Sequence, residues 1–344
     1  MMANSSTSVL IAGIGGASLG TEILKCLDLA GRYDVFGCDI SPLAYGHYQD
    51  GFVETFLADR ERYVESLMEI CTANDIRAII PGGEEPMNLL APRSAEFREV
   101  GIHIAGNSPE VITTCSHKKR LFERLMELNL PVPVTVSVST VDEFQGFPCP
   151  CVIKPATGTG GSRFVFLASD RDEAILYLRY VLANCDTALV QEYVPLDEGE
   201  FTIGVLSLSD GRLVASIALQ RLFHAKLSVL AKTKAGLISS GYTQGLVDEF
   251  SEVRSQAERT AQALRSTGPI NIQARLRDGV LLPFEINPRF SASTYLRAMA
   301  GFNEIDMYLQ YALYGVEPTA PQIRPGYYLR SLSEVFVPRE ELKQ

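Results

Sequence analysis

Short apolar runs alternate with segments of helical spacing over the first third of the chain. The runs have the length and the β-branched content of buried strands, and they occupy residues 9–14, 35–40, 77–81 and 102–105. Apolar residues at helical spacing fill the segments between them, at 18–30, 59–73 and 86–99. Such regular alternation predicts a parallel, doubly wound sheet, in which ligands bind beyond the carboxyl ends of the strands.

The rest of the chain has a different pattern. A polar break at 106–117 precedes a helix at 118–129, which Pro131 and Pro133 bring to an end. Strands are then predicted at 151–154, 163–167, 188–192, 201–207 and 213–220, with the last two joined by a turn at Ser209-Asp210-Gly211.

A second hairpin turns at Asp278-Gly279, and helices are expected at 249–265 and 303–314, with a closing strand at 326–330. Pro283 lies within this hairpin and has no N–H for the ladder, so we expect an edge position or a bulge there. The pattern as a whole predicts an α/β front followed by an α+β body.

Composition narrows the function classes. The 344 residues are 46% hydrophobic and 21% charged, which is globular composition with material for two domains. The net charge of −10 disfavours nucleic acid as a partner. The seven cysteines are scattered without a CxxC pair, and the apolar stretch at 9–19 is too short to span a bilayer. We therefore expect a cytoplasmic protein that binds neither nucleic acid nor membrane.

The first glycine-rich stretch, Gly13 to Gly20, follows a predicted strand and opens a predicted helix. It is similar to a dinucleotide-binding turn, and Asp39 ends the next strand as a ribose-binding acid would. However, Ser18 stands where the third glycine of that pattern is expected. We favour a tight turn for close packing, and an NAD-dependent dehydrogenase is kept as the alternative function.

The second glycine-rich stretch, at 157–162, lies between two predicted strands. Lys154 precedes it on the first strand, and the members of interest in the loop are Gly158, Gly160, Gly161 and Ser162. Backbone N–H groups of such a loop can close over phosphates while the lysine ammonium approaches them from the strand. This stretch therefore predicts a phosphate-binding flap.

A third cluster, at 284–290, combines oxygen ligands with a cation. Glu285 and Asn287 point to the same face of a strand because the side-chain period is two. Gln273, on the partner strand, is expected to face the same site. Carboxylate and amide oxygens are ligands for Mg²⁺, and Arg289 follows in a position to meet a phosphate or carboxylate.

The order of these pieces resembles the ATP-grasp superfamily, in the branch that includes the synthetase part of carbamoyl phosphate synthase and the carboxylate–amine ligases. The resemblance rests on the lysine–glycine flap together with the EINPRF segment at 285–290, and it covers nearly the whole chain. It implies a Rossmann-like pre-ATP-grasp domain at 1–111, a small lid at 112–189 and a large ATP-binding domain at 190–344.

The resemblance also implies roles for single residues. Lys118 and Lys154 match the cations that contact the nucleotide, Glu192, Tyr193 and Val194 match the hinge at the adenine edge, and Glu200 matches the acid that holds the ribose. The implied metal ligands are Gln273, Glu285 and Asn287, for one or two ions of Mg²⁺ or Mn²⁺. Many relatives carry an acid at the first metal position, so Gln273 lowers the negative charge of this site.

The implied reaction joins a small carboxylic acid to an amine through an acyl phosphate, with ADP and phosphate as products. Arg289 and Lys234 are the implied catalytic cations, and Lys234 is our choice within the segment 221–236. The roles of its neighbours Arg221, His224, Lys226 and Lys232 are left open, as are the two substrates and a homodimeric state. A non-catalytic ATP sensor on the same fold is the second alternative.

Overall fold

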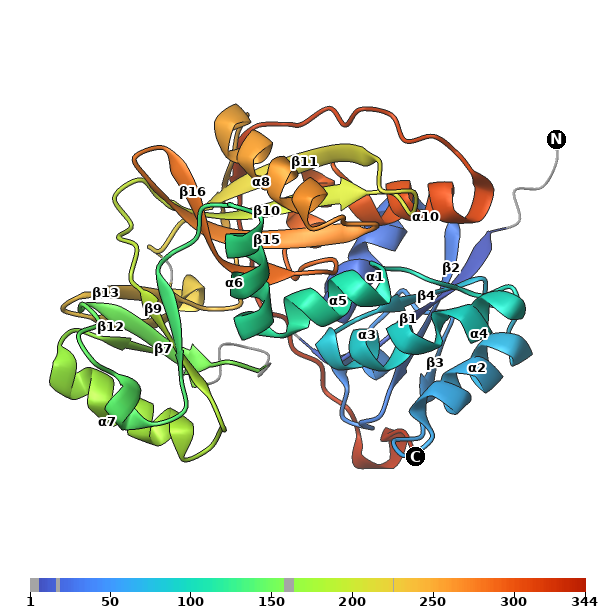
Figure 1. Ribbon diagram of the computed structural model, residues 1–344. Coiled ribbons are helices and arrows are strands. Elements are labelled where there is room, and N and C mark those ends of the chain that lie inside the picture. Colours follow the sequence, from blue (N-terminus) through green and yellow to red (C-terminus); the bar gives the residue numbers. More distant parts are fainter. Residues whose placement is uncertain (1–5, 17–18, 158–163, 225) are drawn as a thin grey trace.

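The computed structural model describes residues 6–16, 19–157, 164–224 and 226–344. Its strands form a five-stranded, a four-stranded and a six-stranded sheet, together with a separate two-stranded hairpin. In Figure 1 the five-stranded sheet lies at the right, the six-stranded sheet at the top and the four-stranded sheet at the lower left. Among the described residues, no helix combines the length and the apolar character needed to cross a bilayer.

The N-terminal sheet is parallel, with the order β3-β2-β1-β4-β5. Its strands are β1 (Thr7–Ala12), β2 (Tyr33–Asp39), β3 (Glu54–Leu57), β4 (Ala78–Pro81) and β5 (His103–Ile104). The helices are α1 (Leu19–Ala30), α2 (Tyr63–Ala73), α3 (Glu84–Leu90) and α4 (Ser94–Glu99). The doubly wound sheet expected from the alternating pattern is confirmed.

Two details of this domain correct the sequence analysis. The short edge strand β3 was not predicted, because its four residues include only one buried side chain and show no clear alternation. The helix predicted at 86–99 is divided into α3 and α4 by a 3₁₀ turn at Ala91–Arg93. Pro92 lies in that turn, and a proline has no N–H for a hydrogen bond within an α-helix.

The polar break at 106–117 contains a helix that was missed. This helix is α5 (Pro109–Ser116), and α6 (Lys118–Glu127) follows it directly. Ser108 caps α5 by accepting a hydrogen bond from the N–H of Val111, and Pro109 occupies the first turn, so a start signal was present in the sequence.

The four-stranded sheet has the order β6-β9-β7-β8 and is covered by one helix. Its strands are β6 (Thr135–Val138), β7 (Cys151–Pro155), β8 (Phe166–Ala168) and β9 (Ala188–Glu192). The covering helix α7 (Arg171–Leu182) was also missed, although Asp170 caps it and Ala174, Leu178 and Val181 form a buried stripe at helical spacing.

The six-stranded sheet, with the order β16-β15-β10-β11-β14-β17, forms the floor of the molecule's main cavity. Its strands are β10 (Glu200–Ser207), β11 (Leu213–Arg221), β14 (Gly245–Val247), β15 (Pro269–Arg277), β16 (Val280–Asn287) and β17 (Gly326–Tyr328). Its helices are α8 (Ser251–Ala263), α9 (Thr294–Met299) and α10 (Glu304–Tyr314). The remaining hairpin consists of β12 (Val229–Thr233) and β13 (Gly236–Ser239).

The expectation for Pro283 is confirmed in both respects. β16 is an edge strand of its sheet, and the register between β15 and β16 shifts between Gln273 and Ala274. Because β16 has a neighbour on one side only, the missing N–H of proline leaves fewer ladder bonds unmade than it would in a central strand.

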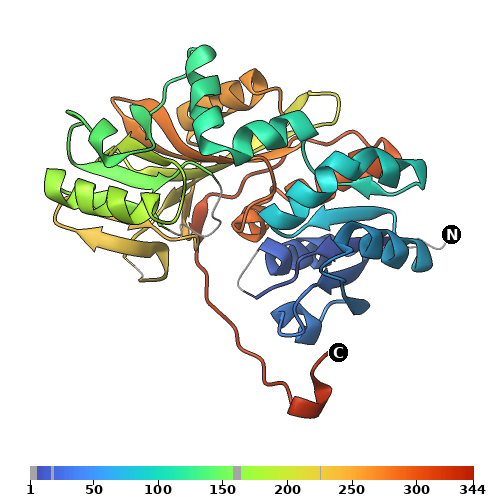
Figure 2. The ribbon, with the colours of Figure 1, turned by 60° about the horizontal axis from the view of Figure 1, so that its bottom comes forward.

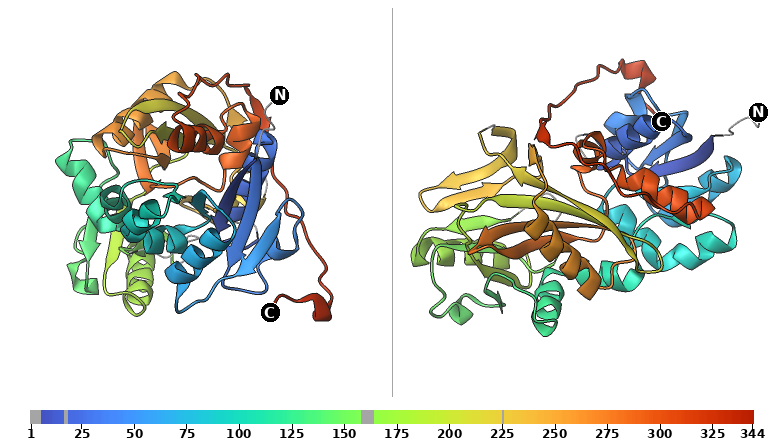
Figure 3. Two further views of the ribbon diagram at one scale, coloured as in Figure 1. Left: turned by 90° about the vertical axis from the view of Figure 1, so that its right-hand side faces the viewer. Right: turned by 90° about the horizontal axis from the view of Figure 1, so that it is seen from above.

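The apolar cores join the N-terminal domain to the six-stranded sheet. One buried cluster contains Ile11 of β1 and Ile23 of α1 together with Leu219 of β11 and Phe302 and Leu309 near α10. Figure 3 shows the C-terminal helices beside the five-stranded sheet. A continuous core of this kind holds the two sheets in one arrangement, because its side chains are shared between them.

The helices α5 and α6 pack with the six-stranded sheet. Leu121, Phe122 and Leu125 of α6 share a buried cluster with Ile203 and Ile272 of that sheet, whereas α7 packs in the core of the four-stranded sheet. The lid boundary at residue 112 stays a prediction, and these contacts place the first two helices of that range on the large sheet.

The C-terminal segment returns to the N-terminal domain. After β17 it runs as an extended chain, visible in Figure 2, and its end contacts the N-terminal sheet. The backbone N–H of Lys343 donates to the Tyr48 hydroxyl at 3.0 Å, and the Lys343 ammonium donates to the carbonyl and hydroxyl oxygens of Thr55. The C-terminal end of the described chain therefore lies against the N-terminal domain, well away from the start of β1 (Figure 1).

We predict that the buried ion pair between α9 and α10 contributes strongly to stability. Arg297 Nη1 lies 3.1 Å from Glu304 Oε1, and both side chains are 1% exposed. Arg297→Met leaves the Glu304 charge buried without its partner and should cost about 3–5 kcal/mol of unfolding free energy. Arg32→Met, which breaks a half-exposed pair with Asp306, is the control and should cost less than about 1 kcal/mol. Urea unfolding measures both, and equal losses would contradict the prediction.

Candidate functional site

A cavity of about 540 Å³ lies where the three sheets face one another. Its wall combines Gly82, Gly83 and Glu84 from the N-terminal domain with residues of β7, β9, α6, β15 and β16. The charged residues that line it are Lys118, Lys154, Arg275, Arg289, Glu84, Glu192 and Glu285. The cavity therefore brings cations and carboxylates from distant parts of the chain into one space.

The three predicted metal ligands lie together on the cavity floor. Gln273 of β15 is directly opposite Glu285 of β16 in the antiparallel register, and Asn287 is two residues further along on the same face. The Asn287 side-chain amide donates to Glu285 Oε1 at 3.0 Å. These side chains offer one carboxylate and two amide oxygens, a set of hard donors that fits Mg²⁺ or Mn²⁺.

Carboxylates and imidazoles do not gather densely around this set. No group of three His, Cys, Asp or Glu side chains that could hold a metal ion occurs within the described part of the chain. A cation at this floor would therefore depend on amide oxygens, on water and on oxygens of a bound ligand as well as on Glu285.

Lys154 lies above the floor and is almost fully buried. Its ammonium donates to Gln191 Oε1 at 2.8 Å and to the Phe284 carbonyl at 2.9 Å, and it lies 5.1 Å from the ring centre of Phe122. The pKa of Lys154 is lowered to about 7, mainly by burial and also by the nearby charge of Lys118, while Glu285 acts in the opposite direction. The cavity thus holds a lysine that is poised between its charged and neutral forms.

Glu192 and Tyr193, at the end of β9, border the cavity, and their side chains contact other parts of the structure. Glu192 Oε2 accepts the N–H of Val134 at 3.1 Å, and the same side chain pairs with Arg277. The Tyr193 hydroxyl accepts the N–H of Leu237 at 2.9 Å. These contacts tie the end of the four-stranded sheet to β13 and to the six-stranded sheet.

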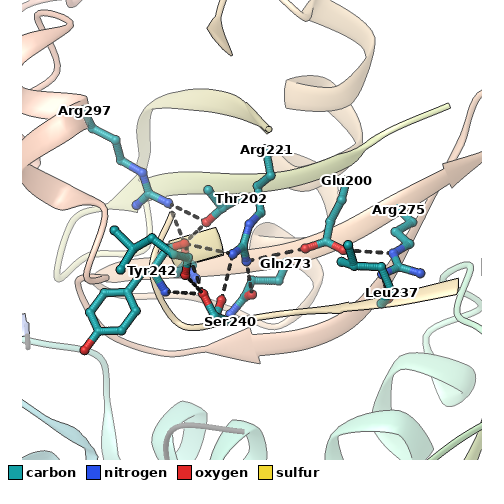
Figure 4. A network of polar contacts seen from close by, with 11 residues as sticks. Glu200, Thr202, Arg221, Leu237, Ser240, Tyr242, Gln273, Arg275 and Arg297 are labelled. Atoms are coloured by element: carbon teal, nitrogen blue, oxygen red, sulfur yellow. Dashed lines mark hydrogen bonds and ion pairs between the residues drawn. The ribbon is translucent and has the colours of Figure 1, made fainter. Parts of the chain in front are cut away.

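Glu200 is not among the described residues that line the cavity. It is fully buried beneath the floor, with Oε2 at 2.9 Å from Arg275 Nε and Oε1 at 3.4 Å from Arg221 Nη1. Figure 4 shows the carboxylate between the two guanidinium groups. Both oxygens face buried cations, and Oε1 has no hydrogen-bond partner among the described residues, so the ribose-binding role implied for Glu200 stays a prediction.

Arg289 marks the end of the cavity beside the N-terminal domain. Its Nη2 lies 3.3 Å from Glu84 Oε1, and its Nη1 donates to the Phe290 carbonyl at 3.0 Å. The Nε atom is buried and has no hydrogen-bond acceptor among the described residues. A buried donor without an acceptor is costly in a protein, so this guanidinium can still accommodate an anionic oxygen.

The remaining predicted residues divide into two groups. Lys234 lies outside the cavity lining, with an exposed ammonium 3.3 Å from Asp170 Oδ2 at the start of α7, so the structure does not bring it to the other cations. The loop residues Gly158, Gly160, Gly161 and Ser162 lie outside the described residues.

The first glycine-rich turn serves packing within the N-terminal domain. Asp39 accepts the backbone N–H groups of Ile14 and Ser41, each at 3.0 Å, so its two oxygens are used inside the turn. A Cβ on Gly20 would lie 2.0 Å from the carbonyl oxygen of Gly13, so this position admits only glycine. These contacts support the packing interpretation of the stretch.

Sequence reasoning missed several polar residues at this site. No role was given to Glu84 at the start of α3, to Arg275 and Asn271 on β15 or to Thr202 on β10, and the role of Arg221 at the end of β11 was left open. Strand periodicity places Asn271 and Arg275 on the same face as Gln273, which was an available signal. Glu84 follows the carboxyl end of β4 directly, where ligands of doubly wound sheets bind.

Two family models match the chain in separate regions. A model described as the PylC-like N-terminal domain matches residues 9–105, and a model described as ATP-grasp in the biosynthetic pathway with Ter operon matches residues 184–335. The carbamoyl phosphate synthase large chain of Methanothrix thermoacetophila is 25% identical over 331 residues, covering 84% of this chain and 28% of that one. That of Thermomicrobium roseum is 27% identical over 241 residues, covering 67% and 21%.

The chain spans about a quarter of the length of these curated relatives. Solved structures show the same fold at low identity. An L-amino acid ligase from Bacillus licheniformis has a TM-score of 0.67 at 16% identity, covering 93% of this chain and 78% of that one. A D-alanine–D-alanine ligase from Bacillus anthracis has a TM-score of 0.59 at 16% identity, covering 90% and 97%.

The two matched regions correspond to the N-terminal sheet and to the part of the chain that carries the cavity floor. The resemblance proposed from the lysine–glycine flap and the segment at 285–290 is thereby confirmed at the level of the superfamily. The chain is therefore similar to the PylC-like N-terminal domain over residues 9–105 and to an ATP-grasp domain over residues 184–335.

Proposed function

We propose that this protein is an ATP-dependent ligase that joins a small carboxylic acid to an amine through an acyl phosphate, with release of ADP and phosphate. The observation that carries the proposal is the meeting of Gln273, Glu285 and Asn287 with Lys118, Lys154 and Arg289 around one cavity. Such an arrangement suits phosphoryl transfer, in which the protein acts mainly by positioning its reactants and by compensating charge.

The nucleotide would extend from the hinge to the floor. The backbone at Tyr193 and Val194 would meet the adenine edge, and Lys118 and Lys154 would contact the phosphates. Glu285, Asn287 and Gln273 would hold Mg²⁺ or Mn²⁺, which when bound would reduce the repulsion between the triphosphate and an approaching carboxylate. The chain's own residues would fix the orientation of both reactants.

Arg289 would receive the substrate carboxylate next to the terminal phosphate. Two anions repel each other, and a forked guanidinium in a partly buried site offsets that repulsion more effectively than a solvated lysine would. Its buried Nε still lacks an acceptor among the described residues, which supports an anion at this end of the cavity. The amine would then displace phosphate from the acyl phosphate to form the amide.

The identity of the two substrates is not carried over from the relatives, because the chain spans only about a quarter of their length. The nicotinamide alternative loses support because Asp39 is used within its own turn. The sensor alternative is separated from the ligase by acid-dependent release of ADP, which only a ligase would catalyse.

The proposal is tested with a panel of small acids and hydroxylamine in place of the amine. We expect ADP, phosphate and a hydroxamate, with an isotope-labelled carboxylate oxygen appearing in the phosphate. Arg289→Ala should reduce hydroxamate formation by roughly 10²-fold or more, the scale for one lost transition-state donor. Arg259→Ala changes an exposed arginine of α8 that contacts Ser255 and serves as the control. AMP and pyrophosphate as products would contradict the proposal.

We predict that Glu285→Gln separates nucleotide binding from turnover. The substitution keeps the shape of the side chain but removes the only carboxylate of the floor set, so turnover should fall by at least about 10²-fold. ATP affinity should fall much less, since the hinge and both lysines are unchanged. Calorimetry and ADP release measure the two quantities, with exposed Glu252→Gln on α8 as the control. A Glu285→Gln protein that keeps its turnover would contradict the assignment of Glu285 as a metal ligand.

We predict that ATP binding takes up a proton above neutral pH. In the free protein burial holds the pKa of Lys154 at about 7, so its amine is mostly neutral at pH 8. Phosphate oxygens favour the charged form, so binding should take up close to one proton, and affinity should fall about tenfold per pH unit above pH 7. Calorimetry in buffers of different ionisation enthalpy measures this uptake. Lys154→Arg should abolish it, and uptake that persists in that variant would contradict the assignment.

A further inference from the structure

Three ionised side chains form a buried row across the centre of the six-stranded sheet. Arg275 lies on β15, Glu200 on the adjacent β10 and Arg221 on β11, beyond β10. Glu200 is 0% exposed, and the two arginines are 4% and 6% exposed. One carboxylate faces two guanidinium groups (Figure 4), so the three side chains of the row carry a net charge of +1 at the cavity floor.

Arg221 is held in this position from several directions. Its Nη2 donates to the carbonyl oxygens of Ser240 and Tyr242, at 2.7 and 3.3 Å, and its Nη1 lies 3.4 Å from Glu200 Oε1. The Nε atom is buried and has no hydrogen-bond partner among the described residues. A guanidinium with this many fixed contacts stays where it is whether or not a ligand is bound, so its charge is a permanent property of the floor.

The same guanidinium contacts a predicted metal ligand. Arg221 Nη1 donates to Gln273 Oε1 at 3.4 Å, and that oxygen is the atom that Gln273 would offer to a cation. Gln273 in turn lies opposite Glu285 on the neighbouring strand. A divalent ion bound to Gln273 would therefore lie close to a fixed positive charge in a region from which water is largely excluded, where like charges repel strongly.

On the other side of the floor the surroundings are different. Asn287 and Glu285 contact each other at 3.0 Å, and within the described part of the chain neither makes a hydrogen bond or ion pair with an arginine, although the Glu285 charge acts on Arg221 from a longer distance. Glu285 is also the only carboxylate among the three predicted ligands. Glu285 and Asn287 are therefore suited to a divalent cation. At Gln273 the guanidinium of Arg221 already supplies a positive charge.

We propose that Arg221 takes the place of one metal ion, so that the nucleotide binds with a single divalent cation held by Glu285 and Asn287. This inference rests on the proposed function, since it assumes that the ligand is ATP. Arg221 acts as a positioning residue: it does not line the cavity, and it engages Gln273 and sets the charge beneath the phosphates. A neutral glutamine at the first metal position is consistent with this arrangement, because an acid there would form an ion pair with Arg221.

The test counts Mn²⁺ ions bound with the non-hydrolysable analogue AMP-PNP, by electron paramagnetic resonance and equilibrium dialysis. The wild-type protein should bind one Mn²⁺ per chain. Gln273→Glu should still bind one, since the new carboxylate is neutralised by Arg221. The double variant Gln273→Glu with Arg221→Met should bind two, because the carboxylate is then free to hold a second ion. Arg259→Met, on the exposed face of α8, is the control and should leave the count at one.

Each outcome decides between the two proposals. Two ions in the wild-type protein, or in Gln273→Glu alone, would overturn the role of Arg221 and leave the ligase proposal standing. A folded double variant that still binds one ion would also overturn it. If AMP-PNP does not bind to the wild-type protein, the proposed function itself fails. Circular dichroism establishes whether each variant is folded. If the double variant does not fold, the numbers of Mn²⁺ ions bound by the wild-type protein and by Gln273→Glu still decide the question.

Discussion

The buried row of Arg275, Glu200 and Arg221 is the interaction on which the arrangement of the site depends. Buried charges are costly unless they are paired and hydrogen-bonded, and here most of the partners come from segments that border the cavity, although Glu200 Oε1 and Arg221 Nε have no hydrogen-bond partner among the described residues. Arg275 donates to the carbonyl oxygens of Val194 and Leu237, at 2.7 and 2.8 Å, as well as to Glu200. The hinge after β9, the hairpin strand β13 and the cavity floor are therefore connected through one carboxylate and two guanidinium groups.

The position of the cavity follows from the way the apolar cores are divided. The N-terminal sheet and the six-stranded sheet share a core through α1, α9 and α10, whereas the four-stranded sheet has a core of its own with α7. The contacts between the four-stranded sheet and the rest include apolar packing, as for Leu189 beside Ile203, and polar contacts, as in the hydrogen bond from Lys154 to the Phe284 carbonyl. Polar groups that face one another across such a boundary leave space for a charged ligand.

Local pattern predicted most of the fold and the floor of the site. The alternation of side chains on β16 was sufficient to place Glu285 and Asn287 on one face, and the lack of an N–H in Pro283 was sufficient to locate an edge strand with a bulge. The partners of Glu200 could not be predicted this way. Periodicity shows which side of a strand a residue occupies, but the two arginines that bury this carboxylate come from other strands.

The distance of Lys234 from the other predicted cations has a related reason. It lies among several cations in one segment, and the segment folds into a short hairpin that points its end toward Asp170 and away from the floor, while Arg221 at its start turns inward. Composition cannot distinguish these two directions. The helices α5 and α7, in contrast, were missed although Ser108 and Asp170 were available as capping residues, so attention to caps would have recovered them.

The N-terminal domain lines the cavity and also provides a carboxylate that contacts Arg289. Glu84 is held at the start of α3, directly after Gly82 and Gly83, and its carboxylate lies 3.3 Å from Arg289 at the end of the cavity beside this domain. On the proposed function, a substrate carboxylate that approaches Arg289 must either compete with Glu84 or share the guanidinium with it. An acid that carries a group able to interact with Glu84 would meet less repulsion than one that does not. The choice among acids would then depend on a residue of the PylC-like domain, while the phosphate chemistry depends on the ATP-grasp domain, so a change of substrate would not require a change in the cavity floor.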